Sequence, residues 1–550
     1  MREIVHLHIE APVCSVVERL TGTRPESVFL EKPKNTEFGD YATNIAMIGA
    51  KRAGGDPKML AKEIKKAIQE NDEEGFFSRI DIAGPGFINF FLSAPAVINM
   101  VNHLVNSDDY LSFPIADPPK TIIEFVSANP TGPLHVGHGR GAAFGDSLAR
   151  ILRFTGRSVT TEYYVNDVGR QIEVLGRSLY LRYLESMGKK VEFPDDHYRG
   201  EYLKKIAKEV REKEGDKYLG SEDDTPDFFL TYGMGRILEG IREDLERFNV
   251  QIDSWFGEET LYASDEVDRS INLLKEKGCV YEKDGAIWFK STLFGDDKDR
   301  VIVRANNQKT YFASDIAYHL NKQRRGFGEM IDIWGADHHG YVPRLRAATK
   351  SLGIDEKDFK VILVQFVTLI KDGAAVSMST REGRFETLRD VLDEVGSDAA
   401  RFFYLLRNAN SHLDFDLDLA KKESSDNPVY YVQYAHARIC SILREAADRG
   451  IELPAKLYVS GDAEKEELEL MKKSLEFRDV VEDASAFLEP HRIPFYLIEC
   501  GKLFHSFYNR YRFITEERSV TMKKLALALA IKKVIATGLA LIGVSAPERM

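Results

Sequence analysis

Cysteine is scarce in this sequence, and long apolar runs are absent. The 550 residues include four widely separated cysteines, Cys14, Cys279, Cys440 and Cys500, and no Cys-x-x-Cys pair. We therefore expect neither a disulfide framework nor a cysteine zinc site, and a reducing cytoplasm is the simplest location. The sequence has no run of eighteen apolar residues and its N-terminus carries charges, so neither a transmembrane helix nor a signal peptide is expected.

Positive charge is also in short supply. The chain has 75 Lys and Arg against 87 Asp and Glu, a net charge of −12, which by itself argues against a nucleic-acid partner. Residues 501–550 reverse this balance, because nine Lys or Arg accompany three Glu there, with aromatic residues between them. Such a mixture could bind a phosphate backbone and stack on unpaired bases. The alternative is a solvated amphipathic helical face.

The length predicts three or four domains. Residues 1–112 combine helical patterns with short strands and indicate an N-terminal α/β module, in which Asp40 is expected to cap a helix. Residues 397–427 are predicted to form a connecting helical stem. Residues 428–550 show few strand signals and are predicted to form an all-α bundle.

The central region, 116–396, alternates strand and helix patterns, which is typical of a doubly wound parallel sheet of the Rossmann-like kind. A charged helical stretch at about 187–300 is too long for a loop and is expected to be an insertion packed on this core. The expected strands are Ile122–Val126, Val159–Val165, Val301–Val303, Met330–Trp334 and Val361–Leu369.

The segment 121–145 has the strongest local pattern. An apolar strand is followed by a turn rich in Pro and Gly, and a helix with small residues begins near His135. A helix N-terminus after a strand suits an anion, because free backbone N–H groups and the helix dipole face it. His135 and His138 flank Gly137 at that point, where imidazoles could donate hydrogen bonds to phosphate oxygens and a flat base could lie against the glycine.

A dinucleotide-binding site is a competing interpretation of the same segment. Gly137-His-Gly-Arg-Gly-Ala142 matches G-x-G-x-x-A, and Glu162 follows twenty residues later. However, residues 127–134 separate the strand from these glycines and include two prolines, which would disturb the tight first turn. We therefore favour the phosphate site over the dinucleotide fingerprint.

A second candidate segment is Val376-Ser-Met-Ser-Thr-Arg-Glu-Gly383, which follows the last predicted strand of the sheet. A loop of hydroxyls, glycine and arginine at that edge could close over a triphosphate. Taken alone, the signal is weak, since most such loops only connect elements.

Together the two segments resemble class I aminoacyl-tRNA synthetases, and the arginyl-tRNA synthetase family in particular. Further matching segments are Tyr163–Asp167, Tyr311 with Asp315, Trp334–Gly340, Pro428–Arg438 and Ala546–Met550. The histidine motif of the resemblance comprises Ser127, Ala128, Asn129, Pro130, Thr131, Gly132, Pro133, Leu134, His135, Val136, Gly137 and His138.

The resemblance implies an arginine–tRNA ligase. Such an enzyme joins L-arginine to the α-phosphate of ATP, releases pyrophosphate, and transfers arginine to the terminal ribose of tRNA(Arg). It implies ATP with substrate-associated Mg²⁺, no tightly bound cofactor, no metal ligand from the protein, no membrane, and a monomer. The bundle 428–550 would bind the anticodon, and residues 1–112 would contact the tRNA elbow.

The resemblance also implies roles for single residues. ATP contacts fall on His135, Gly137, His138, Ser377, Met378, Ser379 and Arg381. Arginine contacts fall on Glu124, Ser127, Asn129, His138, Tyr311, Asp315 and His339. Contacts with tRNA fall on Asn35, Phe38, Tyr431, Arg438 and Met550.

The sequence departs from the family in one loop. The family signature Lys-Met-Ser-Lys-Ser is replaced by Ser377-Met-Ser-Thr-Arg381, so both lysines that would neutralise phosphate charge are missing. By its place upstream of the histidine motif, Lys120 is predicted to substitute for them, with Lys371 and Arg381 as other candidates. A nucleotidyltransferase and a binding-only paralogue stay open as alternative functions. The first would have no use for a basic aromatic bundle, and the second would not need His135 or Asp315.

Overall fold

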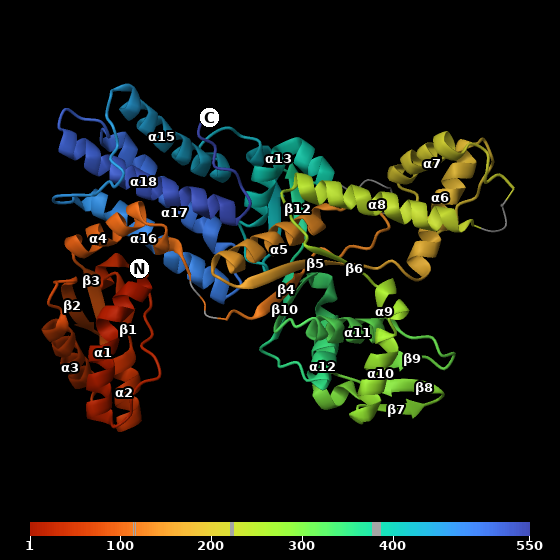
Figure 1. The fold of residues 1–550 in the computed structure, drawn as a ribbon, viewed down its shortest axis with the longest axis horizontal. Coiled ribbons are helices and arrows are strands. Elements are labelled where there is room, and N and C mark those ends of the chain that lie inside the picture. Colours follow the sequence, from red (N-terminus) through yellow and green to blue (C-terminus); the bar gives the residue numbers. More distant parts are fainter. Residues whose placement is uncertain (114, 116, 221–224, 377–386) are drawn as a thin grey trace.

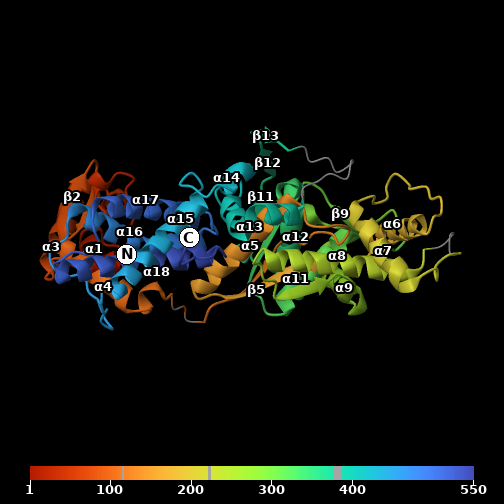
Figure 2. The ribbon, with the colours of Figure 1, turned by 90° about the horizontal axis from the view of Figure 1, so that it is seen from above.

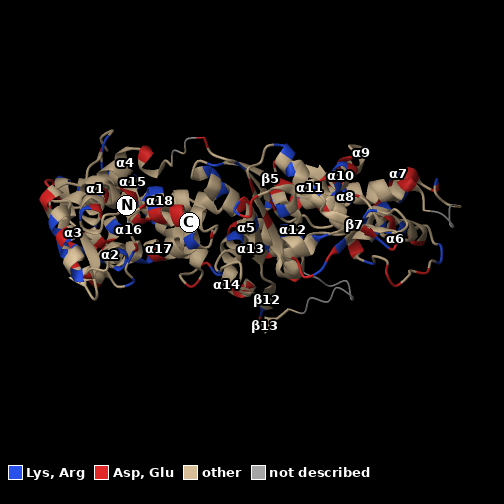
Figure 3. Ribbon diagram, turned by 90° about the horizontal axis from the view of Figure 1, so that it is seen from below, with Lys and Arg blue, Asp and Glu red and all other residues tan. Residues whose placement is uncertain are grey.

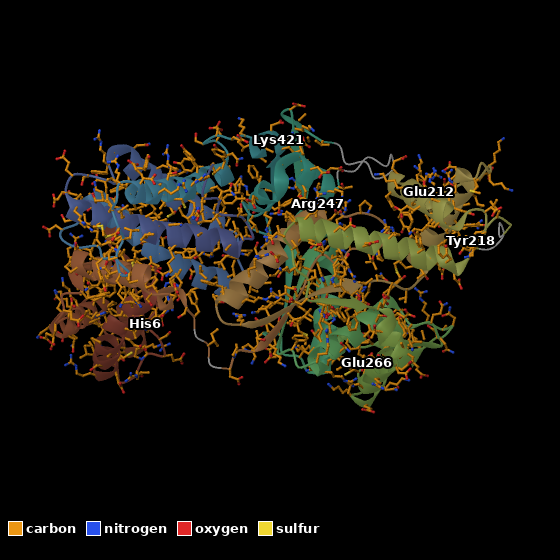
Figure 4. All side chains as sticks on the ribbon, turned by 45° about the horizontal axis from the view of Figure 1, so that its top comes forward. His6, Glu212, Tyr218, Arg247, Glu266 and Lys421 are labelled. Carbon is orange, nitrogen blue, oxygen red and sulfur yellow. The ribbon has the colours of Figure 1, made fainter. Side chains whose placement is uncertain are left out.

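The fold comes from a computed structural model, which describes residues 1–113, 115, 117–220, 225–376 and 387–550. The molecule is elongated, with the N-terminal domain and the C-terminal helices toward one end, the parallel sheet near the middle, and α6 (Arg170–Ser186) and α7 (Glu201–Glu214) toward the other end (Figure 2). Lys and Arg are interspersed with Asp and Glu along the whole length (Figure 3). The labelled residues Glu212 and Tyr218 lie far from His6 of the N-terminal domain (Figure 4).

The N-terminal domain is a three-stranded antiparallel sheet, in the order β1-β3-β2, packed with four helices. The prediction that Asp40 caps a helix is wrong, because Tyr41–Thr43 pairs with β3 and α2 begins only after Asn44. Asp40 instead accepts from the Leu92 amide (2.8 Å) and pairs with Lys472 (2.7 Å) of the C-terminal helices. The elements are α1 (Arg2–Thr21), β1 (Tyr41–Thr43), α2 (Ile45–Ala53), α3 (Pro57–Asn71), β2 (Phe77–Ala83), β3 (Phe87–Leu92) and α4 (Ala94–Asn106).

A five-stranded parallel sheet forms the centre of the molecule, in the order β11-β10-β4-β5-β6 (Figure 1). The predicted doubly wound fold is confirmed, because helices cover both faces. Ile123 of β4 packs in the same core as α5, whereas its neighbour Ile122 packs with α11 and α12. The elements are β4 (Lys120–Glu124), α5 (Val136–Phe154), β5 (Ser158–Val165), α6 (Arg170–Ser186), α7 (Glu201–Glu214), α8 (Asp227–Arg247), β6 (Ser254–Gly257), α9 (Glu259–Ala263), α10 (Glu266–Glu276), β7 (Val280–Lys283), β8 (Ala286–Phe289), β9 (Arg300–Val303), α11 (Tyr311–Arg324), β10 (Glu329–Gly335), α12 (Val342–Leu352), β11 (Phe359–Val364), β12 (Val367–Lys371) and β13 (Ala374–Ala375).

Two strand predictions need correction. The segment Val301–Val303 lies in β9, which belongs to a separate antiparallel sheet with β7 and β8. The fifth strand of the central sheet is β6, inside the stretch that was interpreted as insertion. The apolar run Val361–Leu369 divides at Gln365 and Phe366, and its second half, β12, pairs with β13 and β14 instead. The pairing partner of a short strand is determined by tertiary contacts, and the sequence of the strand does not show which partner it will have.

Residues 428–550 are helical, as predicted, whereas the predicted helical stem 397–427 contains a strand, β14 (Leu413–Asp416). Helix α13, which is broken at Gly396 (φ 77°), leads into β14 and α14 and then into four long helices. In Figure 1 these helices lie between the N-terminal domain and α5. The elements are α13 (Leu388–Tyr404), β14 (Leu413–Asp416), α14 (Leu417–Ala420), α15 (Pro428–Asp448), α16 (Lys465–Ala486), α17 (Arg492–Arg510) and α18 (Arg518–Leu541).

One buried side chain joins three of these parts. The Arg401 guanidinium of α13 donates to the carbonyls of Ile542 (2.7 Å), Phe248 (3.0 Å) and Asn249 (3.0 Å). It also pairs with the Asp146 carboxylate of α5 at 2.5 Å, and both side chains are almost completely buried. The end of α18, the end of α8 and the middle of α5 are therefore held by a single residue.

Candidate active site

His135 and His138 cap the N-terminus of α5. His135 is the N-cap, and its Nδ1 accepts from the amides of Gly137 (3.1 Å) and His138 (3.4 Å). The His138 Nδ1 accepts in turn from the His135 amide (3.2 Å), and the two rings stack at 3.6 Å. This reciprocal capping satisfies backbone donors that a helix start leaves open.

Both imidazoles are neutral at physiological pH. Burial lowers the pKa of His138 to about 3 and also lowers the pKa of His135, although Asp337 opposes the second shift. Because Nδ1 of each ring accepts a backbone N–H, each neutral ring carries its proton on Nε2. The pair can therefore donate two N–H groups to an anion.

Small residues of the motif have packing roles as well. A Cβ at Gly137 would lie 3.0 Å from the His135 ring, so this glycine makes room for the imidazole. A Cβ at Gly145 would lie 2.3 Å from the Phe125 ring, and one at Gly139 would lie 2.8 Å from Tyr404 of α13. Glycine thus lets α5 approach β4 and α13 closely.

The turn between β4 and α5 excludes the dinucleotide interpretation. Strand β4 ends at Glu124 and α5 begins at Val136, so the tight turn of that fingerprint is missing here. The acid of the supposed fingerprint, Glu162, is engaged by Arg325 (2.6 Å) and by the Tyr318 hydroxyl (2.7 Å).

Strained backbone positions the first polar group of the turn. Val126 and Ser127 have positive φ values of 69° and 38°, which are unusual for residues with a side chain, above all for a β-branched one. In this conformation the Ser127 hydroxyl donates to Glu124 Oε1 (3.0 Å) and accepts from the Tyr164 amide (3.0 Å). The turn therefore fixes a hydroxyl beside a buried carboxylate.

A cavity of about 870 Å³ lies in front of the histidines. The loop before α7 and the first turn of that helix also line it, and the Tyr202 hydroxyl of α7 donates to the Thr131 carbonyl (2.5 Å). Its lining residues are Asn129, Thr131, Gly132, Pro133, His135, Val136, Gly137, His138, Asp195, His197, Tyr198, Arg199, Gly200, Tyr202, Phe366 and Val367. A cavity of this size accommodates a nucleotide.

The chain that follows the second predicted motif contacts the histidine turn. Thr387 forms an antiparallel bridge with His135, and the Leu388 amide donates to the Leu134 carbonyl (2.8 Å). The loop residues themselves lie outside the described residues, as the following predicted ATP contacts do: Ser377, Met378, Ser379 and Arg381.

A second cavity, of about 370 Å³, adjoins the first and shares Asn129 with it. One face of α11 supplies much of its lining, because Tyr311, Asp315, Tyr318 and His319 recur at helical spacing. Its lining residues are Glu124, Val126, Ser127, Asn129, Tyr164, Asn166, Glu258, Tyr311, Asp315, Tyr318, His319, Asp332, Ile333, Trp334, Gly335, His338, Tyr341 and Leu345.

Buried charges surround this second cavity. The Lys322 ammonium is completely buried and pairs with Glu124 (2.6 Å) and Asp332 (2.9 Å). His319 Nε2 contacts the other oxygen of Asp332 at 2.9 Å. Burial is the largest influence on the pKa values of Glu124, Lys322 and Asp332. It raises the pKa of Glu124, whereas Lys322 and His319 overcome it at Asp332 and lower that pKa to about 2.

Two further acids face the cavity and form no ion pair among the described residues. Asp315 accepts from the Tyr341 hydroxyl, and burial raises its pKa. Burial raises the pKa of Glu258 to about 7, and its Oε1 is a buried atom without a hydrogen-bond partner. Lining carboxylates thus outnumber the one lysine that balances them, so the cavity suits a ligand with positive charge.

Two other predicted site residues lie away from the lining of the two cavities. Lys120 begins β4, whereas the histidine motif follows the other end of that strand, roughly 13 Å further along it. A lysine side chain there does not reach the cavity at the histidines. His339 is exposed and its Nδ1 contacts the Ala336 carbonyl (3.1 Å), whereas its neighbour His338 lines the acidic cavity.

The candidate anticodon residues meet in one aromatic cluster between α15 and α17. The Arg438 guanidinium lies 4.5 Å from the ring centroids of both Tyr434 and Tyr508 and donates to His505 Nδ1 (3.2 Å). Tyr431 stacks at a tilt against His505 (4.4 Å). Cationic and aromatic side chains therefore share one surface, as nucleic-acid sites require.

Some of the aromatic and basic residues of segment 501–550 stabilise the fold and are not free to contact a nucleic acid. Phe504, Phe507 and Phe513 are buried core residues, and Lys533 pairs with Asp108 of the N-terminal region (2.8 Å). Of the other predicted tRNA contacts, Asn35 caps a short turn at Glu37, and Phe38 (53%) and Met550 (49%) are exposed.

Several residues of the acidic cavity were not predicted. Tyr318, His319 and Lys322 continue the α11 face seven, eight and eleven residues after Tyr311, so helical spacing could have found them. Asp332 is an acid inside the apolar strand β10, which is a signal in itself. Glu258 follows the short strand β6 and carries no such mark.

Comparison with known proteins agrees with this geometry. Three family models match consecutive parts of the chain. They are described as arginyl tRNA synthetase N terminal domain (residues 8–92), tRNA synthetases class I (R), catalytic domain (99–418) and DALR anticodon binding domain (432–550). The parallel sheet and histidine turn are thus those of a class I tRNA synthetase catalytic domain.

Full-length relatives define the family more narrowly. The chain is 49% identical to an arginine–tRNA ligase of Syntrophotalea carbinolica over 96% of both proteins, and 47% identical to one of Desulfosudis oleivorans over 100% of both. It therefore belongs to the arginyl-tRNA synthetase family. A solved putative arginyl tRNA synthetase from Campylobacter jejuni aligns with a TM-score of 0.76 and 39% identity, over 84% of this chain and all of that one. The Thermus thermophilus arginyl-tRNA synthetase, at 22% identity, shares the fold over 99% of this chain (TM-score 0.79).

Two kinds of feature are absent from the described residues. None of the helices there is long and apolar enough to cross a membrane. No group of three His, Cys, Asp or Glu side chains there is arranged to hold a metal ion.

Proposed function

We propose that this chain ligates L-arginine to tRNA(Arg). The arginine carboxylate attacks the α-phosphate of ATP and forms arginyl-adenylate, and pyrophosphate leaves. A hydroxyl of the terminal tRNA ribose then attacks the activated carbonyl, and AMP leaves. The observation that carries this proposal is a cavity with uncompensated carboxyl groups that adjoins a nucleotide-sized cavity at a capped helix start.

The acidic cavity fits the charges of arginine. Arginine carries a guanidinium and an α-ammonium, and carboxylates are the preferred partners of both. Asp315 and Glu258, which form no ion pair in the described structure, would accept from the guanidinium, with Tyr311 beside them. Glu124 and Ser127, held together at 3.0 Å, would receive the α-ammonium next to the shared residue Asn129.

The histidine pair serves the phosphate chemistry. Two Nε2–H donors at a helix N-terminus face an anion that gains negative charge as the bond to pyrophosphate breaks. Because both rings stay neutral, they stabilise by hydrogen bonding and positioning and do not act as acids. Mg²⁺ would be carried by the ATP phosphates, where it neutralises charge on the leaving pyrophosphate.

The other domains serve tRNA in this proposal. We assign anticodon binding to residues 428–550 through Tyr431, Arg438 and Met550, and elbow contact to residues 1–112 through Asn35 and Phe38. We divide the remainder into a catalytic domain, 116–396, and a stem, 397–427. A single chain contains both cavities, which supports a monomer, and four unpaired buried cysteines support a cytoplasmic location.

Charging of total tRNA with radioactive arginine tests the proposal. We expect arginine to be esterified in an ATP-dependent reaction, with citrulline, which lacks the charge, discriminated by at least about 100-fold in kcat/KM. Charging without ATP, or equal use of citrulline, would contradict the proposal. A nucleotidyltransferase would transfer AMP without arginine, and a binding-only relative would retain tRNA affinity with no charging.

A further inference from the structure

Arg140 is a buried cation on the first turn of the catalytic helix. It lies two residues after His138 on α5 and is only 2% exposed. Neither the histidine pair nor the acidic cavity uses its side chain. A guanidinium in such a place needs an explanation, because an isolated buried charge is costly.

Its hydrogen bonds go to backbone carbonyls. One Nη1 donates to Gln365 (2.8 Å) and Ser411 (2.9 Å), and Nη2 donates to Asn408 (3.0 Å). Gln365 immediately precedes Phe366 and Val367, which line the cavity at the histidines. The side chain therefore extends from the histidine turn under the wall of the nucleotide cavity.

No carboxylate balances this charge in the described part of the chain. Arg140 takes part in none of the ion pairs found there, and the one ionisable neighbour that influences it is the Tyr404 hydroxyl. Burial lowers the pKa of Arg140 to about 10, so the guanidinium is still charged at neutral pH. Arg401, also completely buried, has Asp146 as its counter-charge. Arg140 thus adds an uncompensated positive charge beneath the site.

The sequence shows where such a charge is needed. The segment Ser377-Met-Ser-Thr-Arg381 contains one cation where the family signature has two lysines. Lys371 does not fill the gap, since it pairs with Glu394 at 2.7 Å. Lys120 lies at the wrong end of β4.

We propose that Arg140 is a positioning residue whose buried charge favours the ATP triphosphate and offsets the missing lysines. It acts through the field it adds at the histidine turn and through the wall that it braces, without touching the substrate. The low dielectric around it preserves the field, which water would otherwise screen. The inference rests on the proposed function for the reaction that the exchange assay measures. Its ligand, ATP, does not depend on which amino acid the enzyme activates.

Two substitutions separate charge from hydrogen bonding. Arg140→Lys keeps the charge and loses the forked donor, whereas Arg140→Gln keeps an N–H₂ donor and loses the charge. We expect Arg140→Lys to keep at least a third of the arginine- and tRNA-dependent ATP–pyrophosphate exchange rate, and Arg140→Gln to lose about 30-fold or more. Arg153→Gln, at the far end of α5, where the arginine is half-buried and pairs with Asp253, is the matched control and should match the wild-type rate.

A pH profile gives a second readout that needs only the lysine variant. Burial lowers the pKa of a lysine, so its charge is present at low pH and lost as the pH rises. The exchange rate of Arg140→Lys should therefore fall between about pH 7 and 9, relative to wild type, in which the arginine stays charged. A purely structural role of Arg140 would give parallel profiles and would lower the rates of the lysine and glutamine variants alike. Either result would overturn the proposal.

Calorimetric binding of ATP to the full chain keeps this inference separate from the proposed function. We expect Arg140→Gln to weaken the ATP affinity about tenfold more than Arg140→Lys does. If this order holds while the wild type fails to charge arginine, the proposed function fails and the role of Arg140 stands. If both variants bind ATP equally, the role of Arg140 is refuted, whatever the amino-acid substrate.

Discussion

Replacing Arg401 by methionine should destabilise the centre of the molecule severely. Methionine fills much of the same volume but donates no hydrogen bond. The carbonyls of Ile542, Phe248 and Asn249 would then lose their donor, and Asp146 would lose its buried partner. The guanidinium also packs against Gly543, where a Cβ would lie 2.5 Å from it, and methionine would lose this contact.

The magnitude follows from these contacts. Breaking a buried ion pair costs about 3–5 kcal/mol. The lower end applies here, because Arg150 still pairs with Asp146 at 2.7 Å. Three buried carbonyls add roughly 1 kcal/mol each even after partial rearrangement. A total of about 6 kcal/mol would lower the melting temperature by about 10 °C or more.

Arg247→Met is the matched control, because Arg247 also joins α8 to α13. It pairs with Asp393 at 2.5 Å, but the two side chains are 46% and 59% exposed. Such a surface pair contributes about 1 kcal/mol or less. Differential scanning calorimetry of both variants measures the difference. Equal shifts, or a shift below about 2 °C for Arg401→Met, would refute the view that Arg401 holds the junction.

Four further predictions concern the two cavities, the tRNA surface and the packing of α5. Asp315→Asn should raise the KM for arginine by about 100-fold and leave the KM for ATP within about threefold, because it removes a carboxylate from the acidic cavity alone; a parallel rise in both constants would contradict this assignment. The pKa of Glu258 is raised to about 7 by burial, so its charge is present above that pH and is lost below it. The kcat/KM for arginine should therefore rise about tenfold per pH unit up to pH 7 and then level, and Glu258→Gln should abolish this limb of a steady-state pH profile. Arg438→Ala should raise the KM for tRNA about tenfold through lost stacking, whereas Arg449→Ala, in an exposed pair with Glu445 on the same helix, should leave it unchanged in charging assays. Gly145→Ala places a Cβ 2.3 Å from Phe125 and should abolish ATP–pyrophosphate exchange. Gly141→Ala, whose Cβ would meet open space, is the control and should retain exchange. Equal activities of the two variants would mean that α5 can shift on β4.

Local patterns predicted the elements that have strong signals of their own. The apolar strand at Ile122, the Pro- and Gly-rich turn and the helix start at His135 were all visible in the sequence, because each depends on neighbours along the chain. The helical character of residues 428–550 was visible for the same reason. By contrast, the assignment of Val301–Val303 to the central sheet was wrong, since a short strand carries no record of its partner.

The site shows the same division. Tyr311 and Asp315 were predicted by their resemblance to a family motif, and the structure brings them to the cavity that Glu124 and Ser127 also line. Lys120 was expected at the start of this strand, and the structure places it there, but the distance of that end from the histidine turn depends on how the turn after the strand folds. Glu258 was not predicted, because the residues that surround its carboxyl group, Tyr164 of β5 and Ser314 and Asp315 of α11, are distant from it in the sequence.

The sequence by itself determined the periodic elements, the histidine turn and the missing lysines of the second motif. All of these are statements about residue types at fixed spacing, and backbone sterics and side-chain pattern settle them locally. Only the tertiary structure decided which charges are balanced. Lys322 meets two acids from two strands, Arg401 meets one acid from another helix, and Arg140 meets none in the described residues. Burial and the distance to an opposite charge control the electrostatic energy, and both arise when distant segments pack together.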